Sequence, residues 1–416
     1  MKLLLSIFAI LYLGNFSYCQ KADVDKWITD IDFYHKTLED SHIDLYHLIS
    51  KEEFILEIQK IKEQLPQLNH FQVILALMKL THKIGGGKGD GHTAIPLWPM
   101  KLHRYPITLF DFGDVLRVIK VKKEYDYLLG KKLIRIDGMP ISEIYKKVSK
   151  LTPFTENRQS SMDKTCNSLI ISEILFGLDI VKQKDKATFT FADDAGNYES
   201  IILEALTKEE NEESEYKEIV FQYPNLTRPE SYKTKKLWYT SLRDSLTVYV
   251  NFKGYPNEVE MNSFTEDLLE NIKKHNLQNV IIDLRDNYGG NFFIGLILAR
   301  RLNVADCIDW KSGVYVLTNR ETYSAAMVNA LQFRQLLNAK IVGEPTGANP
   351  NGYQDLGQFN LPNSNLIITY TKRLFRLQEV NTEGVQPDIL IIPKWEKHEK
   401  GVDEVLEWVI KDIEEK

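Results

Sequence analysis

Cysteine is scarce in this sequence, with only three among its 416 residues. So small a number excludes a disulfide-rich scaffold, and the lack of any Cys-x-x-Cys pair excludes a zinc ribbon. Neither sign of charge dominates, because 52 Lys and Arg stand against 58 Asp and Glu, which leaves a net charge of −6. Proteins held on nucleic acid by phosphate contacts carry a concentrated cationic face. We therefore expect no nucleic acid partner.

Long hydrophobic runs are missing as well, except near the N-terminus. Residues 1–20 contain one basic residue, an apolar run over residues 3–13 that is too short to cross a bilayer, and a polar exit. This pattern predicts a signal peptide cleaved before Gln20. The protein is then exported, periplasmic or secreted, and its mature chain has no transmembrane segment. Lipid anchoring at Cys19 is disfavoured, because a bulky tyrosine precedes it.

The rest of the composition is typical of a globular protein. Hydrophobic residues make up 43% and charged residues 26%, and the length suits two or three domains. Cys166 and Cys307 are the cysteines of the mature chain, and the sequence leaves open whether they pair or stay free. The oligomeric state also stays open.

Changes of hydrophobic pattern along the chain predict an α/β protein of several segments. From residue 237 onward strands alternate with helices, as in a largely parallel sheet covered by helices. The acidic run EENEESEYKE at 209–218 is interpreted as a solvated loop or linker. The predicted boundaries are 1–20 for the signal peptide, 21–95 for an N-terminal helical region ending in the loop GDGHT, 96–151 for a small β-rich module, 152–236 for a mixed linker and β region, 237–395 for the core and 396–416 for a C-terminal helix.

The module at 96–151 resembles a PDZ domain in one respect. The stretch LLGKKLIRIDGMPI, followed by a helix, gives a strand-turn-helix pattern with a type I′ turn at Asp137-Gly138. Any small β domain with such a turn gives the same pattern. The resemblance predicts that this module binds peptide ends.

Ser324 lies between a predicted strand and an apolar helix, in the stretch VYVLTNRETYSAAMVNALQF. A serine at this place either caps the helix by accepting a backbone N–H bond, which is the commoner role, or acts as a nucleophile whose oxygen is exposed at the strand end. The free N–H groups of a helix start stabilise an oxyanion as readily as a capping oxygen. Other elements have to decide between the two roles.

Two such elements are present. VIIDLRDNYGGN places Gly289 and Gly290 directly after a buried strand, where backbone can approach a ligand without side-chain obstruction. One N–H from either glycine and one from Ala325 would form an oxyanion hole. The loop GDGHT offers His92 as the base that a serine nucleophile needs. The loop is not a phosphate-binding P-loop, because Lys88 is followed by glycine rather than Ser or Thr.

Together these motifs resemble peptidase family S41, the C-terminal processing (tail-specific) and tricorn-core group. The resemblance rests on five ordered stretches and on the loop GDGHT, and covers residues from about 237 to 393. It implies a ClpP/crotonase-like catalytic core, Ser324 as nucleophile, and Ala325 with Gly289 or Gly290 as oxyanion donors. The five stretches are DLRDNYGG, LTNRETYSAA, IVGEPTG, LPNS and GVQPDI.

The identity of the catalytic base indicates which branch of the family the sequence resembles. Processing peptidases use a Ser/Lys dyad, but the stretch that would carry the lysine reads GANPNG here and has Asn349 near the expected place. The resemblance therefore favours the tricorn-like branch, with His92 as base. That branch orients its histidine through a preceding serine and a downstream glutamate. Here Gly91 precedes the histidine, and Glu383, with Glu379 second, is the predicted orienting residue.

These inferences predict an exported serine endopeptidase that cleaves peptides or unfolded proteins through an acyl-enzyme and needs no metal or organic cofactor. The alternative is a catalytically inactive S41-like protein that binds peptides or small ligands. Arg373 or Arg376 is a candidate for holding a substrate carboxylate, although solvent exposure is the commoner state of each. The substrate and the cleavage preference stay open.

Overall fold

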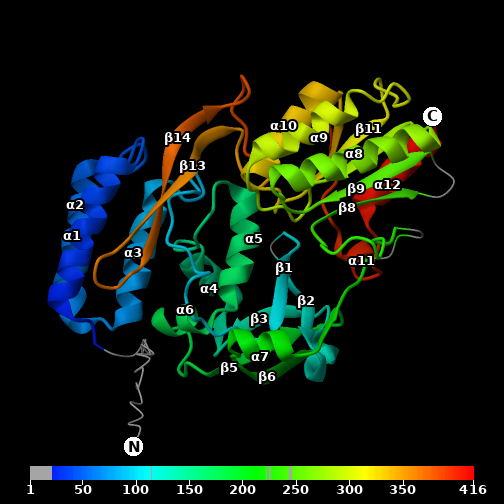
Figure 1. The fold of residues 1–416 in the computed structure, drawn as a ribbon. Coiled ribbons are helices and arrows are strands. Elements are labelled where there is room, and N and C mark those ends of the chain that lie inside the picture. Colours follow the sequence, from blue (N-terminus) through cyan, green and yellow to red (C-terminus); the bar gives the residue numbers. More distant parts are fainter. Residues whose placement is uncertain (1–20, 114, 222, 224–225, 243–245) are drawn as a thin grey trace, which may run out of the picture.

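The structure, a computed structural model, describes residues 21–416 apart from 114, 222, 224–225 and 243–245. The signal peptide predicted for residues 1–20, and with it Cys19, lies outside the described residues. N-terminal helices, a β-rich part and an α/β core follow one another across the molecule, and a long hairpin from the core reaches back to the helices (Figure 1). Within the described residues no helix has the length and apolarity needed to cross a membrane.

The N-terminal region is helical, as predicted. Each of its long helices begins at a side-chain cap, from Asp23, Ser50 and Asn69, which satisfies backbone N–H groups that the first turn leaves free. Apolar residues at helical spacing, such as Ile31 and Leu38, face a shared core. The helices are α1 (Val24–Ser41), α2 (Lys51–Gln64), the 3-10 turn η1 (Leu65–Gln67) and α3 (His70–Gly85).

The β-rich part is one seven-stranded sheet in the order β1-β2-β3-β5-β6, with β4 paired to β3 and β7 to β2. Because β3 pairs with β5, the sheet runs across the boundary predicted at residue 151. Asp137 and Gly138 both have positive φ, as a type I′ turn requires. The strands are β1 (Ile107–Asp111), β2 (Leu116–Lys122), β3 (Lys132–Ile136), β4 (Met139–Pro140), β5 (Lys186–Ala192), β6 (Tyr198–Glu204) and β7 (Tyr216–Glu218), with the 3-10 turn η2 (Lys123–Leu128).

The acidic run at 209–218 is not the predicted loop. It forms most of α7 (Lys208–Glu213) and then β7, because Thr207 and Glu210 make a capping box that starts a helix despite the repelling charges. Three further helices lie between β4 and β5 along the chain: α4 (Ile141–Val148), α5 (Arg158–Leu169) and α6 (Ser172–Gly177). Cys166, on α5, and Cys307 are free thiols.

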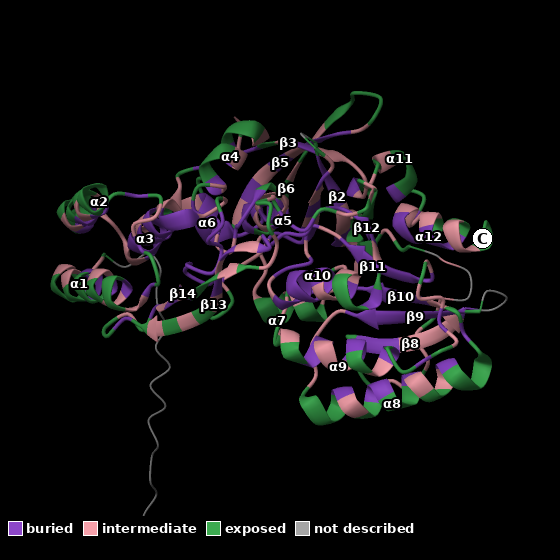
Figure 2. Cartoon of the chain, turned by 90° about the horizontal axis from the view of Figure 1, so that it is seen from above, coloured by how far each residue is buried: buried purple, intermediate pink, exposed green. Residues whose placement is uncertain are grey.

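The core is a six-stranded sheet in the order β15-β12-β11-β10-β9-β8, parallel except for the β8–β9 pair. Figure 2 shows β9 to β11 buried between helices on the two faces. The strands are β8 (Leu237–Leu242), β9 (Thr247–Phe252), β10 (Asn279–Asp283), β11 (Val314–Thr318), β12 (Lys340–Gly343) and β15 (Ile389–Leu390), and the helices are α8 (Glu258–His275), α9 (Phe292–Leu302), α10 (Ala325–Leu337), α11 (Trp395–His398) and α12 (Glu404–Glu414).

The register of this sheet places two loops side by side. Asp283 at the end of β10 pairs with Leu317 near the end of β11, and the strands are parallel. Their following loops therefore leave the sheet at the same edge, which brings the glycine pair after β10 beside the serine before α10. This adjacency is the structural basis of the candidate site.

A long hairpin, β13 (Asn351–Asn360) and β14 (Ile367–Arg376), lies over the N-terminal helices and was not predicted. Thr369 on β14 exchanges backbone hydrogen bonds with Ala94, and its hydroxyl donates to the carbonyl of His92 at 2.7 Å. The tip of the hairpin is held by Asp30 on α1. The hairpin therefore fixes the histidine loop from the side opposite the core.

Asp30 provides a test of this arrangement. Its buried carboxylate accepts three N–H groups, two from Asn363 and one from Ser364, at 2.8–2.9 Å. We expect Asp30→Asn to lower the free energy of unfolding by about 2–3 kcal/mol, because the new amide sets a donor against donors. Asp32→Asn, on the same helix in an exposed pair with Lys62, should cost under about 1 kcal/mol. Urea unfolding measures both, and equal effects would contradict the role of Asp30.

Candidate active site

Ser324 has the backbone of a strained turn, with φ 50° and ψ −122°, directly before α10. Such a conformation costs a non-glycine residue about 1–3 kcal/mol, so the surroundings hold it there. Among the described residues no backbone N–H of α10 bonds to its side chain, whereas Ser50 caps α2 by accepting from Glu53. Ser324 Oγ instead lies 3.2 Å from Nε2 of His92. The structure brings these two predicted residues together.

His92 is almost completely buried, with 4% of its surface exposed. Burial lowers the pKa of its imidazole to about 4, while the charges of Asp90 and Asp355 oppose the shift. The ring is therefore neutral at neutral pH, the form that accepts a proton from a hydroxyl group. It stacks on Tyr323 with a centroid separation of 5.6 Å and an interplanar angle of 26°, which fixes its plane.

The carboxyl group beside His92 belongs to Glu156. Its Oε1 lies 3.9 Å from Nδ1 of the imidazole, and within the described residues Nδ1 has no hydrogen-bond partner. Its oxygens accept the backbone N–H of Asn349 at 2.7 Å and the side-chain amide of Gln354 at 2.6 Å. Burial raises the pKa of this carboxyl well above its ordinary value, although these hydrogen bonds, with one from Gly91, act in the opposite direction.

The residues predicted to orient the histidine lie elsewhere. Glu383 and Glu379 are both exposed, and the structure does not bring either carboxylate to His92. Sequence reasoning missed Glu156, which stands in the segment after α4. Its one sequence signal is its place before Asn157, a residue that can cap a helix, and Asn157 does cap α5.

Two departures of the sequence from the S41 pattern have structural reasons. Asn349, which stands where a lysine was expected, accepts through Oδ1 from the Asn157 side chain at 2.9 Å and the Gly384 backbone at 2.8 Å. A lysine has no acceptor for these bonds. At Gly91, a Cβ atom would lie 2.1 Å from the hydroxyl of Tyr323. A serine at that position would therefore displace the tyrosine ring.

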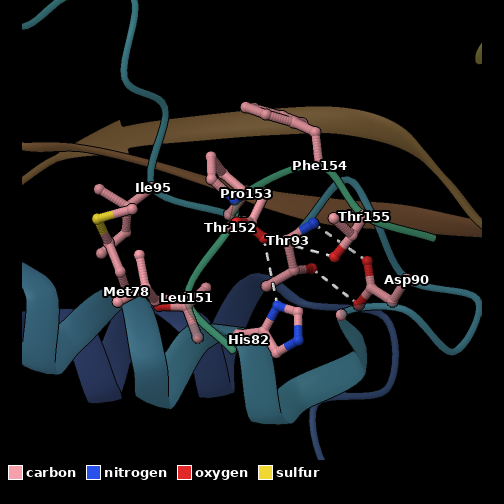
Figure 3. A pocket seen from close by; sticks show the side chains of 13 residues that line it. Met78, His82, Asp90, Thr93, Ile95, Leu151, Thr152, Pro153, Phe154 and Thr155 are labelled. Carbon is pink, nitrogen blue, oxygen red and sulfur yellow. Dashed lines mark hydrogen bonds between the residues drawn. The ribbon is translucent and has the colours of Figure 1, made fainter. Parts of the chain in front are cut away.

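The loop GDGHT is held by a buried polar network around Asp90. This carboxylate accepts from His42 at 2.9 Å and from the hydroxyl of Thr371 at 2.7 Å. Figure 3 shows Thr93 bonded to it through both backbone and hydroxyl. Burial raises the pKa of Asp90, but the bonds from His42, Thr371 and Thr93 outweigh it and lower the pKa overall. The loop thus carries a satisfied, rigid anchor two residues before the imidazole.

The predicted oxyanion donors surround Ser324. Gly289 has φ 101°, and a Cβ there would lie 2.8 Å from Cβ of Ser324 and 3.0 Å from the backbone nitrogen of Ala325, so only glycine fits. Its N–H donates to the side chain of Asn287 at 2.9 Å. Within the described residues the N–H groups of Gly290 and Ala325 have no such partner. These two are the available donors.

A cavity of about 620 Å³ opens beside these groups. His92, Ser324, Gly289 and Gly290 all line it, so the imidazole, the hydroxyl and the glycine backbone face one space large enough for substrate side chains. Across the described ranges no group of three or more His, Cys, Asp or Glu side chains is placed to hold a metal ion. The arrangement suits acyl transfer by a serine.

Comparisons with known proteins relate this chain to a peptidase family and to a known fold. Residues 299–391, which include Ser324, match the model of peptidase family S41. A search of curated protein sequences gives no match. The solved structure of mature CPAF complexed with lactacystin is similar over 94% of this chain and 98% of its own, with a TM-score of 0.64 at 11% identity. A serine-to-alanine mutant of CPAF gives a TM-score of 0.65 at 11% identity over 94% and 96% of the two chains.

The tricorn protease aligns with 94% of this chain and 37% of its own, with a TM-score of 0.45 at 14% identity. The likeness to CPAF shows a shared fold that runs nearly the whole length of both chains. The family match covers the segment from the end of α9 to the end of the core sheet. Residues 299–391 thus carry the pattern of peptidase family S41, and the chain shares the mixed α/β fold of CPAF.

Proposed function

We propose that this protein hydrolyses peptide bonds through an acyl-enzyme, with Ser324 as nucleophile and His92 as general base and acid. The observation that carries the proposal is the 3.2 Å separation of Ser324 Oγ and His92 Nε2, made by a serine that leaves its helix uncapped. A serine hydroxyl needs a neutral base within hydrogen-bond reach to attack a carbonyl. Burial keeps His92 in that form.

In the proposed reaction His92 takes the proton of Ser324 as Oγ attacks the carbonyl carbon of the scissile bond. The oxyanion accepts the N–H groups of Gly290 and Ala325, which lie on the two loops that leave the sheet side by side. His92 then protonates the leaving amine, and a water molecule, activated by the same imidazole, hydrolyses the ester. Glu156 acts as a positioning residue, since its Oε1 faces the Nδ1 side of the ring.

The nucleophile is tested by two serine variants. Ser324→Ala should lower kcat/KM for peptide hydrolysis by roughly 10⁴-fold or more, with an unchanged free energy of unfolding because no cap is lost. Ser50→Ala, which removes a real cap, should cost about 1 kcal/mol of stability and leave kcat/KM unchanged. Undiminished hydrolysis by Ser324→Ala would remove the assignment. If a fluorophosphonate probe fails to label the wild-type protein while the protein still binds peptides, the alternative of a catalytically inactive binding protein is favoured.

The pH dependence tests the base. The pKa of His92 is lowered from 6.5 to about 4 by burial, so the proton-accepting form is lost only as the pH falls through about 4. We expect kcat/KM to stay level between pH 7 and about pH 5 and to decline with an apparent pKa near 4. Intrinsic fluorescence at each pH checks that the fold persists. An acid limb centred near 6.5 would contradict a buried imidazole as base.

Glu156→Gln and Glu383→Gln form a matched pair for the orienting residue. Glu156→Gln sets an amide donor against the N–H groups of Asn349 and Gln354, and should lower kcat by roughly 10²-fold or more. KM should not change, because Glu156 does not line the cavity. Glu383→Gln, on an exposed side chain, should leave both constants unchanged. The reverse outcome would restore the prediction made from the sequence.

A further inference from the structure

Basic side chains line the cavity beside Ser324, and no carboxylate is among its lining residues. Arg104 and Lys164 both line it, and the other lining groups are apolar, aromatic or uncharged, apart from the neutral His92. A largely apolar pocket with one sign of charge selects ligands that carry the opposite charge. The two cations differ in whether their charge is already neutralised.

Lys164 is neutralised within the protein. Its ammonium contacts Asp163 at 2.8 Å and lies 3.7 Å from the ring centroid of Tyr288. The Arg104 side chain donates one hydrogen bond, from Nη1 to the carbonyl of Asn167 at 3.2 Å, and no carboxylate of the described residues forms an ion pair with it. Arg104 is therefore the cation of this cavity whose charge has no counter-ion.

Glu173, a carboxylate whose charge acts on Arg104, is committed elsewhere. Burial lowers the pKa of Arg104, and the charge of Glu173 raises it by less, so the pKa is lowered overall. That carboxylate bonds to His103 at 2.6 Å and contacts Lys184 at 3.4 Å. Binding a carboxylate ligand would stabilise the Arg104 guanidinium, because the group has no ion pair and keeps most of its N–H donors available for a bidentate contact.

The backbone around Arg104 fixes where the guanidinium can reach. Arg104 exchanges two hydrogen bonds of 2.8 Å with Leu206, and the next residue, Tyr105, donates to Ile170 at 2.9 Å. The side chain bonds in turn to the end of α5 through Asn167. The charge is thus presented on anchored chain rather than on a free loop, so little order is lost when a ligand binds.

An apolar wall lies beside this charge. Trp98 is 68% exposed, yet its ring stacks on Phe154 with centroids 4.9 Å apart, and both line the cavity with Ile171 and Leu356. A large exposed aromatic side chain at the mouth of a pocket marks a binding surface. The wall suits an apolar or aromatic substrate side chain next to an anionic group.

We propose that Arg104 determines specificity by binding a substrate carboxylate, so that the preferred substrates are peptides with a carboxylate close to an apolar or aromatic residue at the cleavage site. The inference rests on the proposed function for the position of the scissile bond. The carboxylate comes either from the C-terminus of the peptide or from an Asp or Glu side chain. Arg373 and Arg376 do not line the cavity, and Arg373 pairs with Asp355 at 3.1 Å.

The test measures binding to the Ser324→Ala protein, so it does not depend on turnover. A short fluorescein-labelled peptide with a central phenylalanine is made with a free or amidated C-terminus, and with glutamate or glutamine beside the aromatic residue. Fluorescence anisotropy gives Kd. We expect at least one carboxylate peptide to bind roughly 10- to 100-fold more tightly than its amide, and Arg104→Gln to remove that ratio. The peptide pair that shows this difference in Kd identifies whether Arg104 binds the C-terminal carboxylate or the side-chain carboxylate.

Arg135→Gln is the matched control, because Arg135 also makes one side-chain bond to a backbone carbonyl, at 3.2 Å, but lies exposed on β3. It should leave the ratio intact. Equal Kd values for acid and amide peptides, or a ratio that survives Arg104→Gln, would overturn the inference. Wild-type protein that cleaves peptides without such a preference refutes this inference alone. A preference without cleavage refutes the proposed function alone.

Discussion

The buried pair Glu156-Asn157 is the contact on which the site depends. Glu156 accepts hydrogen bonds from the histidine loop and from the hairpin, and Asn157 donates to the carbonyl of Thr346 and to Asn349 in the segment after β12. The carbonyls of residues 155 and 156 also accept from the backbone N–H groups of Gly87, just before the loop GDGHT, and of Gly89, its first residue. One short segment between α4 and α5 therefore joins three stretches of chain that are far apart in the sequence.

Burial at this junction has chemical consequences. It lowers the pKa of His92 to about 4 and raises that of Glu156, so the imidazole remains an uncharged base across the neutral range. Strain is concentrated at Ser324, whose positive φ aims its oxygen away from the helix and toward the ring. Gly289 is the counterpart of that strain, because only a residue without a Cβ lets the serine turn approach so closely.

The elements of the core could be predicted because periodicity and motif agree there. The alternation of strands and helices predicted from residue 237 onward is present, with α9 as one of its helices, and the loops after β10 and β11 meet because neighbouring parallel strands end at one edge. Glu156 could not be predicted, since its function comes from tertiary neighbours and its local sequence reads as a helix start. Glu383 was favoured for its nearness to a motif, but nearness in sequence does not decide which carboxyl group faces His92. The hairpin β13–β14 was missed because exposed residues alternate along its strands with residues that pack on helices distant in the sequence.

The central claim is that Ser324 and His92 form one reactive unit. Reaction with a fluorophosphonate, followed by peptide mapping in the mass spectrometer, tests it most directly. The account predicts a phosphonyl group on Oγ of Ser324 and a labelling rate that falls by roughly 10²-fold or more in His92→Ala. Modification of a different serine, or an equal rate without the imidazole, would contradict it.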